Sequence, residues 1–423
     1  MWIGLGGKDS SFWRTTAQFA RDSARPHISE WETRGEFPRS LWKELGDRGL
    51  LGMSFGNRPE SLTRLAIALD AFAYGSKDLG IANSWGVHSA MAGTAIDRWA
   101  VESVRKRLLP GMASGKQIAA FALTERSAGS DAASIETTAR RDRRGFVLSG
   151  QKTFVTNSVQ ADVFVVIARD ADLGDRSFSA FVVDGGARGL RVGPAMEKTC
   201  IRTSPCGDVE LNECRVSEQC LLGERGTAFP AIVLPALDLD RCVVWAGRLG
   251  RLRNILEDVT AYAAKRKQFG QAIGLHQAVL FKIAEIRASL ESCETVLSAA
   301  LLRLSQGQPA RSVAAVARYV LGLATMMAAD HAMQTFGGYA FDPRNLVERY
   351  HRDARLDGIG GGTTEIQRLI LGRETLALLD SDGPWMSSFV VPAALALGAN
   401  PKPSKKGARV SLRKLRKQAV STS

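Results

Sequence analysis

The feature that most constrains the fold of this chain is a double change in hydrophobic periodicity. Between Ser10 and Ala113 apolar residues recur at spacings of three and four, as in ESLTRLAIALDAFAYGSKD, which indicates amphipathic helices. Short β-rich segments take over at Gln117, and the helical period returns at Thr227 and lasts to about Leu379. Few enzymes have this order of helices, a β module and helices again.

The two changes divide the chain into four parts. We predict a helical domain over 1–116, a β domain over 117–226, a helix bundle over 227–380 and a basic, mobile extension over 381–423. The β domain is expected to be an antiparallel barrel or sandwich, because segments such as GFVLSGQKTFVT are short and separated by turn residues. The bundle is expected to have four helices, with one long helical segment over 231–269. The fold class is therefore α+β.

The net charge is a poor guide to the partners of this chain. Of the formal +13, the extension from Ser381 onward carries +7, because it has eight Lys or Arg against Asp382 alone, and residues 1–380 carry +6. The folded part is only mildly basic, and the basic residues are not interleaved with aromatic ones. Nucleic-acid binding therefore ranks last among the functions considered.

Composition places the chain among globular proteins. Hydrophobic residues make up 45% and charged residues 23%, and no apolar run is long enough to span a bilayer. The N-terminus lacks the basic-then-apolar pattern of a secretory signal. The six cysteines contain no CxxC pair, so no metal site or redox dithiol is indicated. We therefore expect a cytoplasmic protein that does not bind a membrane.

A second informative stretch is Arg352–Arg368, in which RDARL runs into three consecutive glycines, Gly360 to Gly362. The following Thr363 and Glu365 predict a capped helix start, so we expect a helix–loop–helix. Glycines between two helices let the backbone adopt φ > 0 and approach a flat ligand closely. An ordinary corner between helices would have the same pattern, and this stretch alone leaves both interpretations open.

Four separated stretches carry a common pattern. They are Phe121–Glu125 with Ala128–Asp131, Gly150–Lys152 and Thr156–Asn157; Arg266–Gly270 with His276–Gln277; Gln334–Tyr339; and Arg352–Ala354 with Thr363 and Ile366–Arg368. Taken in this order, they resemble the signatures of the acyl-CoA dehydrogenase family, and the resemblance covers roughly residues 10–380. It implies an FAD-dependent enzyme that dehydrogenates an acyl thioester between its α and β carbons. A carboxylate removes the α proton, and a β hydride passes to flavin N5.

The residue types in these stretches also suit FAD. Flavin binding needs backbone donors and small hydroxyls at the edge of the isoalloxazine ring and a flat wall at its face. Arg266 offers a planar fork suited to a diphosphate, although alone it would more often be a solvated charge at a helix end. The resemblance implies that the Gln334–Gly338 turn reaches the FAD of a neighbouring subunit. The expected cofactor-binding residues are Phe121, Leu123, Thr124, Ser130, Phe154, Thr156, Arg266, Phe269, Gln277, Gln334, Gly337, Gly338, Thr363 and Glu365.

The usual catalytic carboxylate of the family is absent from this chain. Most members carry it as Glu in a Tyr-Glu-Gly-Thr segment, which is matched here by Gly360–Thr363, so Gly361 stands at the position of the base. A branch that resembles isovaleryl-CoA dehydrogenase carries the base as Leu-Glu-Arg on the first bundle helix, matched here by Leu239–Arg241. Asp240 is therefore the expected base, with Asp238 as second choice. A buried flavin pocket would raise the pKa of an Asp towards a useful value.

One further alternative stays open at the level of sequence. Asp240 could instead pair with Arg241 or cap its helix. The residues expected to line the substrate cavity are Ser130, Arg241, Gly361 and Gly362.

The resemblance also implies partners. The thioester is expected on CoA or on an acidic acyl carrier protein, as in relatives from natural-product pathways, and an electron-transfer flavoprotein is the expected electron acceptor. A homotetramer, or at least a dimer, is expected. The alternatives are a flavin oxidase or monooxygenase on the same fold, motivated by Gly361, and a non-catalytic flavoprotein that binds nucleic acid through the basic segment Lys402–Lys417.

Overall fold

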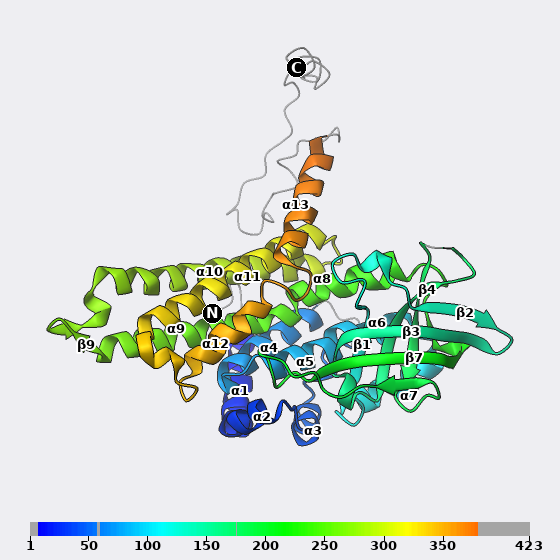
Figure 1. The fold of residues 1–423 in the computed structure, drawn as a ribbon, viewed down its shortest axis with the longest axis horizontal. Coiled ribbons are helices and arrows are strands. Elements are labelled where there is room, and N and C mark those ends of the chain that lie inside the picture. The colour runs from blue at the N-terminus through cyan, green and yellow to red at the C-terminus, as the bar shows by residue number, and fades with distance from the viewer. Residues whose placement is uncertain (1–6, 57–59, 175, 380–423) are drawn as a thin grey trace, which may run out of the picture. The chain divides into compact units, whose positions relative to one another are not determined.

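The structure is a computed structural model that describes residues 7–56, 60–174 and 176–379. The described residues belong to one unit. Its elements follow the expected order of helices, a sheet and helices again (Figure 1). The mobile extension predicted over 381–423 lies outside the described residues.

The helices before the sheet pack around α4 (Ser61–Ser76), which is buried over most of its length. It contacts α1 (Gly7–Ser23) and, from the C-terminal bundle, α9 (Gly247–Lys265). These contacts are close because Gly75 of α4 and Gly250 of α9 face the backbone of the neighbouring helix, with no room for a β-carbon. The other helical segments of this part are η1 (Arg25–His27), α2 (Ile28–Arg34), α3 (Arg39–Asp47), α5 (Gly80–Gly86), the π-helical turn η2 (Val87–Gly93), α6 (Thr94–Trp99) and α7 (Glu102–Ala113).

The β domain is one sheet of eight strands in the order β6-β7-β3-β2-β4-β5-β8, with β1 beside β4. Most neighbours are antiparallel, as expected, but β4 pairs in parallel with both β1 and β2. The sequence did not predict these parallel pairs, because strand direction depends on contacts between distant segments. The strands are β1 (Ala119–Ala122), β2 (Thr138–Asp142), β3 (Gly145–Thr156), β4 (Val163–Asp170), β5 (Phe178–Asp184), β6 (Leu190–Val192), β7 (Cys206–Ser217) and β8 (Leu221–Leu222).

Strand β4 is buried on both faces, and its side chains alternate between two hydrophobic cores. Val163, Val165 and Ile167 belong to the large core shared with the helices, whereas Phe164 and Val166 belong to the smaller core of the β domain. Because successive side chains of a strand point to opposite faces, one face of the sheet packs against the helices and the other completes its own domain. The sheet is thereby held against the helical domains.

The C-terminal bundle departs from expectation in its first helix. The long segment predicted over 231–269 is broken into α8 (Leu234–Cys242), a turn at Val244–Ala246 and α9, and it ends at the hairpin of β9 (Lys267–Gln268) and β10 (Gln271–Ala272). The break sets α8, with Asp240, apart from α9. The other helices are α10 (Gln277–Ser305), α11 (Arg311–Phe336), α12 (Leu346–Leu356) and α13 (Thr364–Leu379).

Helix α11 runs through the middle of the bundle. Contrary to the expectation that no apolar run is long enough to span a bilayer, among the described residues it lies in one helical stretch, Arg311–Phe341, that is long and apolar enough by length and composition. The helix contacts α8, α9, α10, α12 and α13, and 56% of its most apolar 18-residue stretch is buried. These contacts are those of a core helix, whose apolar character comes from packing against other helices.

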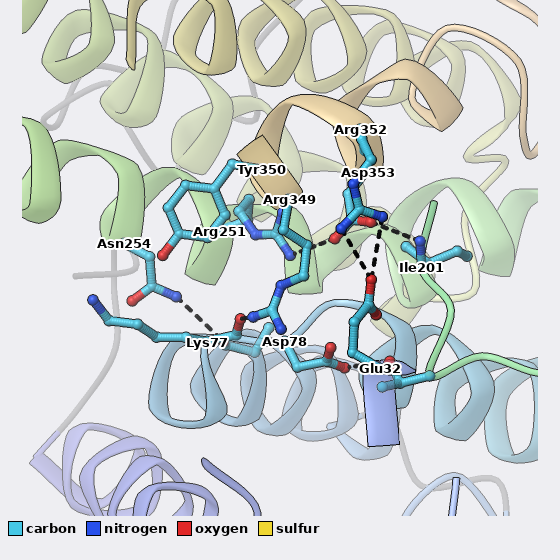
Figure 2. A network of polar contacts seen from close by, with 12 residues as sticks. Glu32, Lys77, Asp78, Ile201, Arg251, Asn254, Arg349, Tyr350, Arg352 and Asp353 are labelled. Atoms are coloured by element: carbon cyan, nitrogen blue, oxygen red, sulfur yellow. Dashed lines mark hydrogen bonds and ion pairs between the residues drawn. The ribbon is translucent and has the colours of Figure 1, made fainter. Parts of the chain in front are cut away.

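Helix α12 is anchored by buried ion pairs, shown in Figure 2. Asp353 accepts hydrogen bonds from Arg251 of α9, at 2.9 Å, and from the backbone N–H of Ile201, at 2.6 Å. Its neighbour Arg352 binds Glu32 of α2 at 3.2 Å. The predicted Arg352–Ala354 signature thus fixes the helix that leads into the glycine stretch.

Candidate functional site

The expected helix–loop–helix is present around the three glycines. Gly361 and Gly362 have φ of +65° and +84°, so both adopt the left-handed backbone that favours glycine. Thr363 caps α13, because its Oγ1 accepts the backbone N–H of Ile366 at 3.3 Å. The exposed carboxyl of Glu365 has a pKa below its usual range, through hydrogen bonds to its own backbone N–H and to the Thr363 side chain.

The structure brings Asp240 and Gly361 together. A β-carbon built on Gly361 would overlap Oδ2 of Asp240 and would lie 2.9 Å from Nε1 of Trp245. Real β-carbons essentially never approach other atoms within 3.0 Å. The Asp240 carboxylate therefore occupies the space in which a side chain at position 361 would begin.

Asp240 is buried without a bonded partner. Within the described residues no hydrogen bond or ion pair joins its carboxylate to another group, and 8% of its surface is exposed. Burial raises the pKa of Asp240 above its usual value, and the charges of Arg248, Arg318 and Arg241 oppose this rise. A buried carboxylate with a raised pKa and free lone pairs has the properties of a general base.

Arg241 does not pair with Asp240. Its Nη1 donates to Oδ1 of Asp238 at 2.9 Å, and both side chains are largely buried. This contact engages Asp238, the second candidate base, and leaves Asp240 free. Arg241 lies beside the glycine loop, since its Nη2 is 3.9 Å from where a β-carbon of Gly362 would stand.

Trp245 contacts two buried arginines next to this carboxylate. The guanidinium carbon of Arg318 lies 3.5 Å from the centre of a Trp245 ring, and that of Arg248 lies 4.1 Å away. Arg248 binds Asp357 at 2.9 Å, and Arg318 binds the carbonyl oxygen of Gly360 through Nε at 3.1 Å and Nη2 at 2.6 Å. The glycine loop is therefore held by groups from α9 and α11.

The β-domain residues expected at the flavin ring lie on adjacent segments. A β-bulge between Lys152 and Val155 gives Phe154 a φ of +54° and leaves 61% of its surface exposed. Thr156, two residues on, and Thr124, whose carbonyl accepts the backbone N–H of Thr153, are partly buried. Exposed aromatic surface next to small hydroxyls fits the edge and face of a flavin. Of the other expected residues, Phe121 and Leu123 are buried and Ser130 is exposed.

A buried ion pair builds this part of the site. Nζ of Lys152 donates to Oε1 of Glu125 at 2.7 Å and to the carbonyl of Leu123 at 3.0 Å, and Glu125 also accepts the backbone N–H groups of Glu136 and Thr137. Burial lowers the pKa of Lys152 to about 8. Burial would raise the pKa of Glu125, but Lys152 and the hydrogen bonds hold it below its usual value.

The residues expected at the diphosphate form a second group. Arg266, Gly337 and Gly338 line a hollow of about 470 Å³ together with Tyr262, Gln268, Ile273, Thr335, Phe336 and Tyr339. The Arg266 guanidinium lies 5.7 Å from the centre of the Tyr339 ring. An exposed arginine in a hollow that is lined in part by glycine backbone is suited to binding a diphosphate.

Three further residues expected in this group do not line the hollow. Phe269 is 94% exposed at the turn of the β9–β10 hairpin. Gln277, the first residue of α10, and Gln334, near the end of α11, are also exposed.

The two groups of cofactor residues are far apart in one chain. Figure 1 shows the β9–β10 hairpin at one end of the bundle and the sheet at the other. A single copy therefore does not unite the residues expected at the flavin ring with those expected at the diphosphate.

Sequence reasoning missed the groups that surround Asp240. Trp245, Arg248 and Arg318 lie in helical patterns that predict only core or solvated positions. Buried arginines at core positions could have been noticed only once α8, α9 and α11 were known to pack together.

Comparison with known proteins gives the family. Residues 8–116, 120–214 and 231–376 match the models of the N-terminal, middle and C-terminal domains of acyl-CoA dehydrogenases. The chain belongs to the acyl-CoA dehydrogenase family. Two curated relatives are similar over most of their length. The mitochondrial isovaleryl-CoA dehydrogenase of Solanum tuberosum is 31% identical (86% of this chain, 89% of the relative), and the L-prolyl-[peptidyl-carrier protein] dehydrogenase of Pseudomonas fluorescens is 32% identical (80% and 90%).

Solved structures of acyl-CoA dehydrogenases and related proteins share this fold. The prolyl acyl carrier protein oxidase AnaB is 29% identical, with a TM-score of 0.84 over 88% of this chain and 99% of its own. An FAD complex of PigA is 28% identical, with a TM-score of 0.83 over the same shares. The three-domain fold, the FAD cofactor and the FAD-dependent dehydrogenation of an acyl thioester, all expected from the sequence, are thus confirmed.

Proposed function

We propose that Asp240 is the base that removes the α proton of the acyl thioester. The observation that carries this proposal is that the Asp240 carboxylate occupies the space of the missing side chain at Gly361. A carboxylate from α8 thus lies where a side chain on the α12–α13 loop would begin. Geometry is the first requirement of a general base, and a raised pKa is the second.

Each group around Asp240 has a part in this proposal. Asp240 accepts the α proton on a carboxylate oxygen, and the product is the α,β-unsaturated thioester. Bound FAD supplies the two-electron acceptor for the hydride that leaves the β carbon. Trp245 and the glycine loop keep water away from the carboxylate, and the nearby arginines stabilise its charged form.

We propose further that the acyl group is carried by CoA or by a carrier protein. The names of two similar proteins refer to prolyl groups on carrier proteins, and another refers to a CoA thioester. The proposed substrate is an acyl thioester of one of these two kinds. A carrier-bound group would be that of a natural-product pathway, and the bleaching experiment below compares both kinds.

We also propose that a second copy of the chain completes each FAD site. Arg266, Gly337 and Gly338 of one subunit would then meet the Phe154 and Thr156 region of another. Large apolar side chains are exposed around the hairpin and the nearby helix ends, which favours an interface there. They are Phe269, Leu275, Leu280, Phe281, Tyr339 and Phe341.

Anaerobic bleaching of the bound flavin tests the role of Asp240. The purified protein is mixed with a panel of acyl-CoA thioesters and of carrier-bound acyl groups. Asp240→Asn should retain FAD and lose bleaching by about 10³-fold or more, since removing a base that acts in the transition state costs on the order of 10²–10⁴. Asp238→Asn is the matched control, because its carboxylate is already paired with Arg241. Full bleaching by Asp240→Asn would falsify the proposal.

An oxidase that uses the same site is the second candidate. It is favoured by the name of AnaB, which is called an oxidase. The two functions differ in what reoxidises the flavin. Fast consumption of O₂ by the reduced protein indicates an oxidase, whereas slow reaction with O₂ and fast transfer to an electron-transfer flavoprotein indicate a dehydrogenase.

A further inference from the structure

We infer that Arg318 is the buried counter-charge of Asp240 and a positioning residue that holds the glycine loop against it. The inference rests on the proposed role of Asp240 as base. Its test measures the coupling between the two side chains separately from turnover.

Arg318 is placed by three contacts. It lies on α11 and is fully buried, and its Nε and Nη2 both bind the carbonyl oxygen of Gly360. Its guanidinium plane covers Trp245, whose Nε1 lies near the same point as Oδ2 of Asp240. Gly322, one turn along α11, makes the placement possible, since a β-carbon there would lie 2.6 Å from Nη1 of Arg318.

The charges around Asp240 come from its own helix, from α9 and α11 and from the α12–α13 loop. On its own helix, Arg241 is balanced by Asp238. From α9 and α11 come Arg248 and Arg318, and the α12–α13 loop contributes Asp357, which binds Arg248.

The segment η2 also packs on α8, and it contributes His88. The His88 ring nitrogens contact the carbonyl of Met112 and the backbone N–H of Ala119, and burial lowers its pKa to about 4, so it is neutral.

One positive charge remains after these pairs are counted. Asp357 lies near both Arg248 and Arg318, and one carboxylate balances only one of the two guanidinium groups. Within the described residues no ion pair joins Arg318 to a carboxylate, and its Nη1 has no hydrogen-bond partner. The remaining negative charge in this cluster is that of Asp240. Isolated buried charges are costly, so each stabilises the charged form of the other.

Arg318 also links the charge to the position of the glycine loop. The Gly360 carbonyl that it binds is one residue before Gly361, the glycine that touches Asp240. The same guanidinium group therefore fixes the loop and favours the ionised carboxylate. Burial alone would favour the protonated form of Asp240, which cannot accept a proton.

Thermal unfolding at pH 7 tests the coupling in the FAD-loaded protein, with four proteins: wild type, Arg318→Met, Asp240→Asn and the double variant. We expect the loss of Tm caused by Arg318→Met to be smaller in the Asp240→Asn background than in wild type, by about 2 °C or more. The reason is that in the Asp240→Asn background the substitution leaves no unbalanced carboxylate. Recovery of folded Arg318→Met only in the Asp240→Asn background also supports the inference. Equal losses of Tm in both backgrounds overturn it, whatever the activity.

Arg349→Met is the matched control for this cycle. Arg349 is buried and donates to the backbone carbonyl of Lys77, but it belongs to the α12 network of Figure 2. We expect no coupling between Arg349 and Asp240.

The pH dependence of flavin bleaching gives a second readout. In Arg318→Met, the midpoint at which the rate rises with pH should move up by about one pH unit, because the pKa of Asp240 rises when an opposite charge is removed. Arg318→Lys keeps the charge and should restore the midpoint. A lower rate with an unchanged midpoint would show that Arg318 is only structural and would overturn the inference.

Discussion

Asp240 and Gly361 occupy one space: the carboxylate from α8 fills the volume in which a side chain on the α12–α13 loop would begin. The two positions are 121 residues apart in sequence. The chain can therefore have a carboxylate at one of them but not at both. The absence of the usual base and the presence of Asp240 are two sides of one packing arrangement.

Substitution of Gly361 should be much more harmful than substitution of its neighbour. Gly361→Ala combines overlap with Asp240 and a positive φ, and an L-residue in that conformation costs about 1–2 kcal/mol before any clash. We expect its free energy of unfolding to fall by about 2 kcal/mol or more in urea titration. Gly360→Ala is the control, because its nearest neighbour, 3.3 Å away, is the flexible side chain of Leu356. Equal losses in the two variants would contradict the steric argument.

The base should be transferable between the two positions only as an exchange. Gly361→Glu alone is expected to unfold more easily and to lose flavin bleaching. Adding Asp240→Gly removes the overlap, so the double variant should have a higher Tm than Gly361→Glu. Thermal unfolding checks the order, and a double variant whose Tm is no higher than that of Gly361→Glu would show that the two side chains do not compete for space.

Asp240 should make the folded protein less stable at neutral pH. Its pKa is raised by burial, so the native state holds the proton more tightly than the unfolded state, and stability is lost as pH rises above the unfolded value of about 3.8. Asp240→Asn removes this penalty, with each unit of pKa shift corresponding to about 1.4 kcal/mol. The Tm of Asp240→Asn should exceed that of wild type at pH 7, and the gap should close towards pH 4. A gap that widens on acidification would reverse the assigned sign.

Lys152 should be needed to hold the flavin-ring segment in place. Lys152→Met leaves the Glu125 carboxylate buried without its cation, and breaking a buried ion pair in this way costs about 3–5 kcal/mol. We expect a lower unfolding midpoint and weaker FAD binding, measured by urea titration and by flavin fluorescence. Gln151→Met is the control, because residue 151 on the same strand is exposed. Wild-type affinity for FAD in Lys152→Met would separate the ion pair from the cofactor site.

Two defective subunits should complement each other if a second copy completes the FAD site. Arg266→Ala should weaken FAD binding at the diphosphate end and Phe154→Ala at the ring end, each by about 1–3 kcal/mol. A mixed dimer of the two variants has one intact site, so co-expressed subunits should bind more FAD than either variant alone. If co-expression adds no FAD, both groups of residues serve the same site in one subunit or different sites altogether.

Local patterns account for what sequence reasoning predicted correctly. Apolar periodicity predicted the helical and β segments, and the glycines of 360–362 together with Thr363 predicted the loop and the capped helix. These features depend on backbone preferences within a few residues of one another. The parallel pairing of β1 with β4 and the break at 244–246 were not predicted, because both depend on packing against distant segments.

The sequence by itself determined the family, the order of the domains and the two acids, Asp238 and Asp240, from which a base could be chosen. Only the tertiary structure distinguished their surroundings: it pairs Asp238 with Arg241 and brings Asp240 against Gly361. It also assembled Trp245 and Arg318 around that carboxylate, from helices far apart in the chain. Charge balance and excluded volume act through space, so they become visible only when the helices are packed.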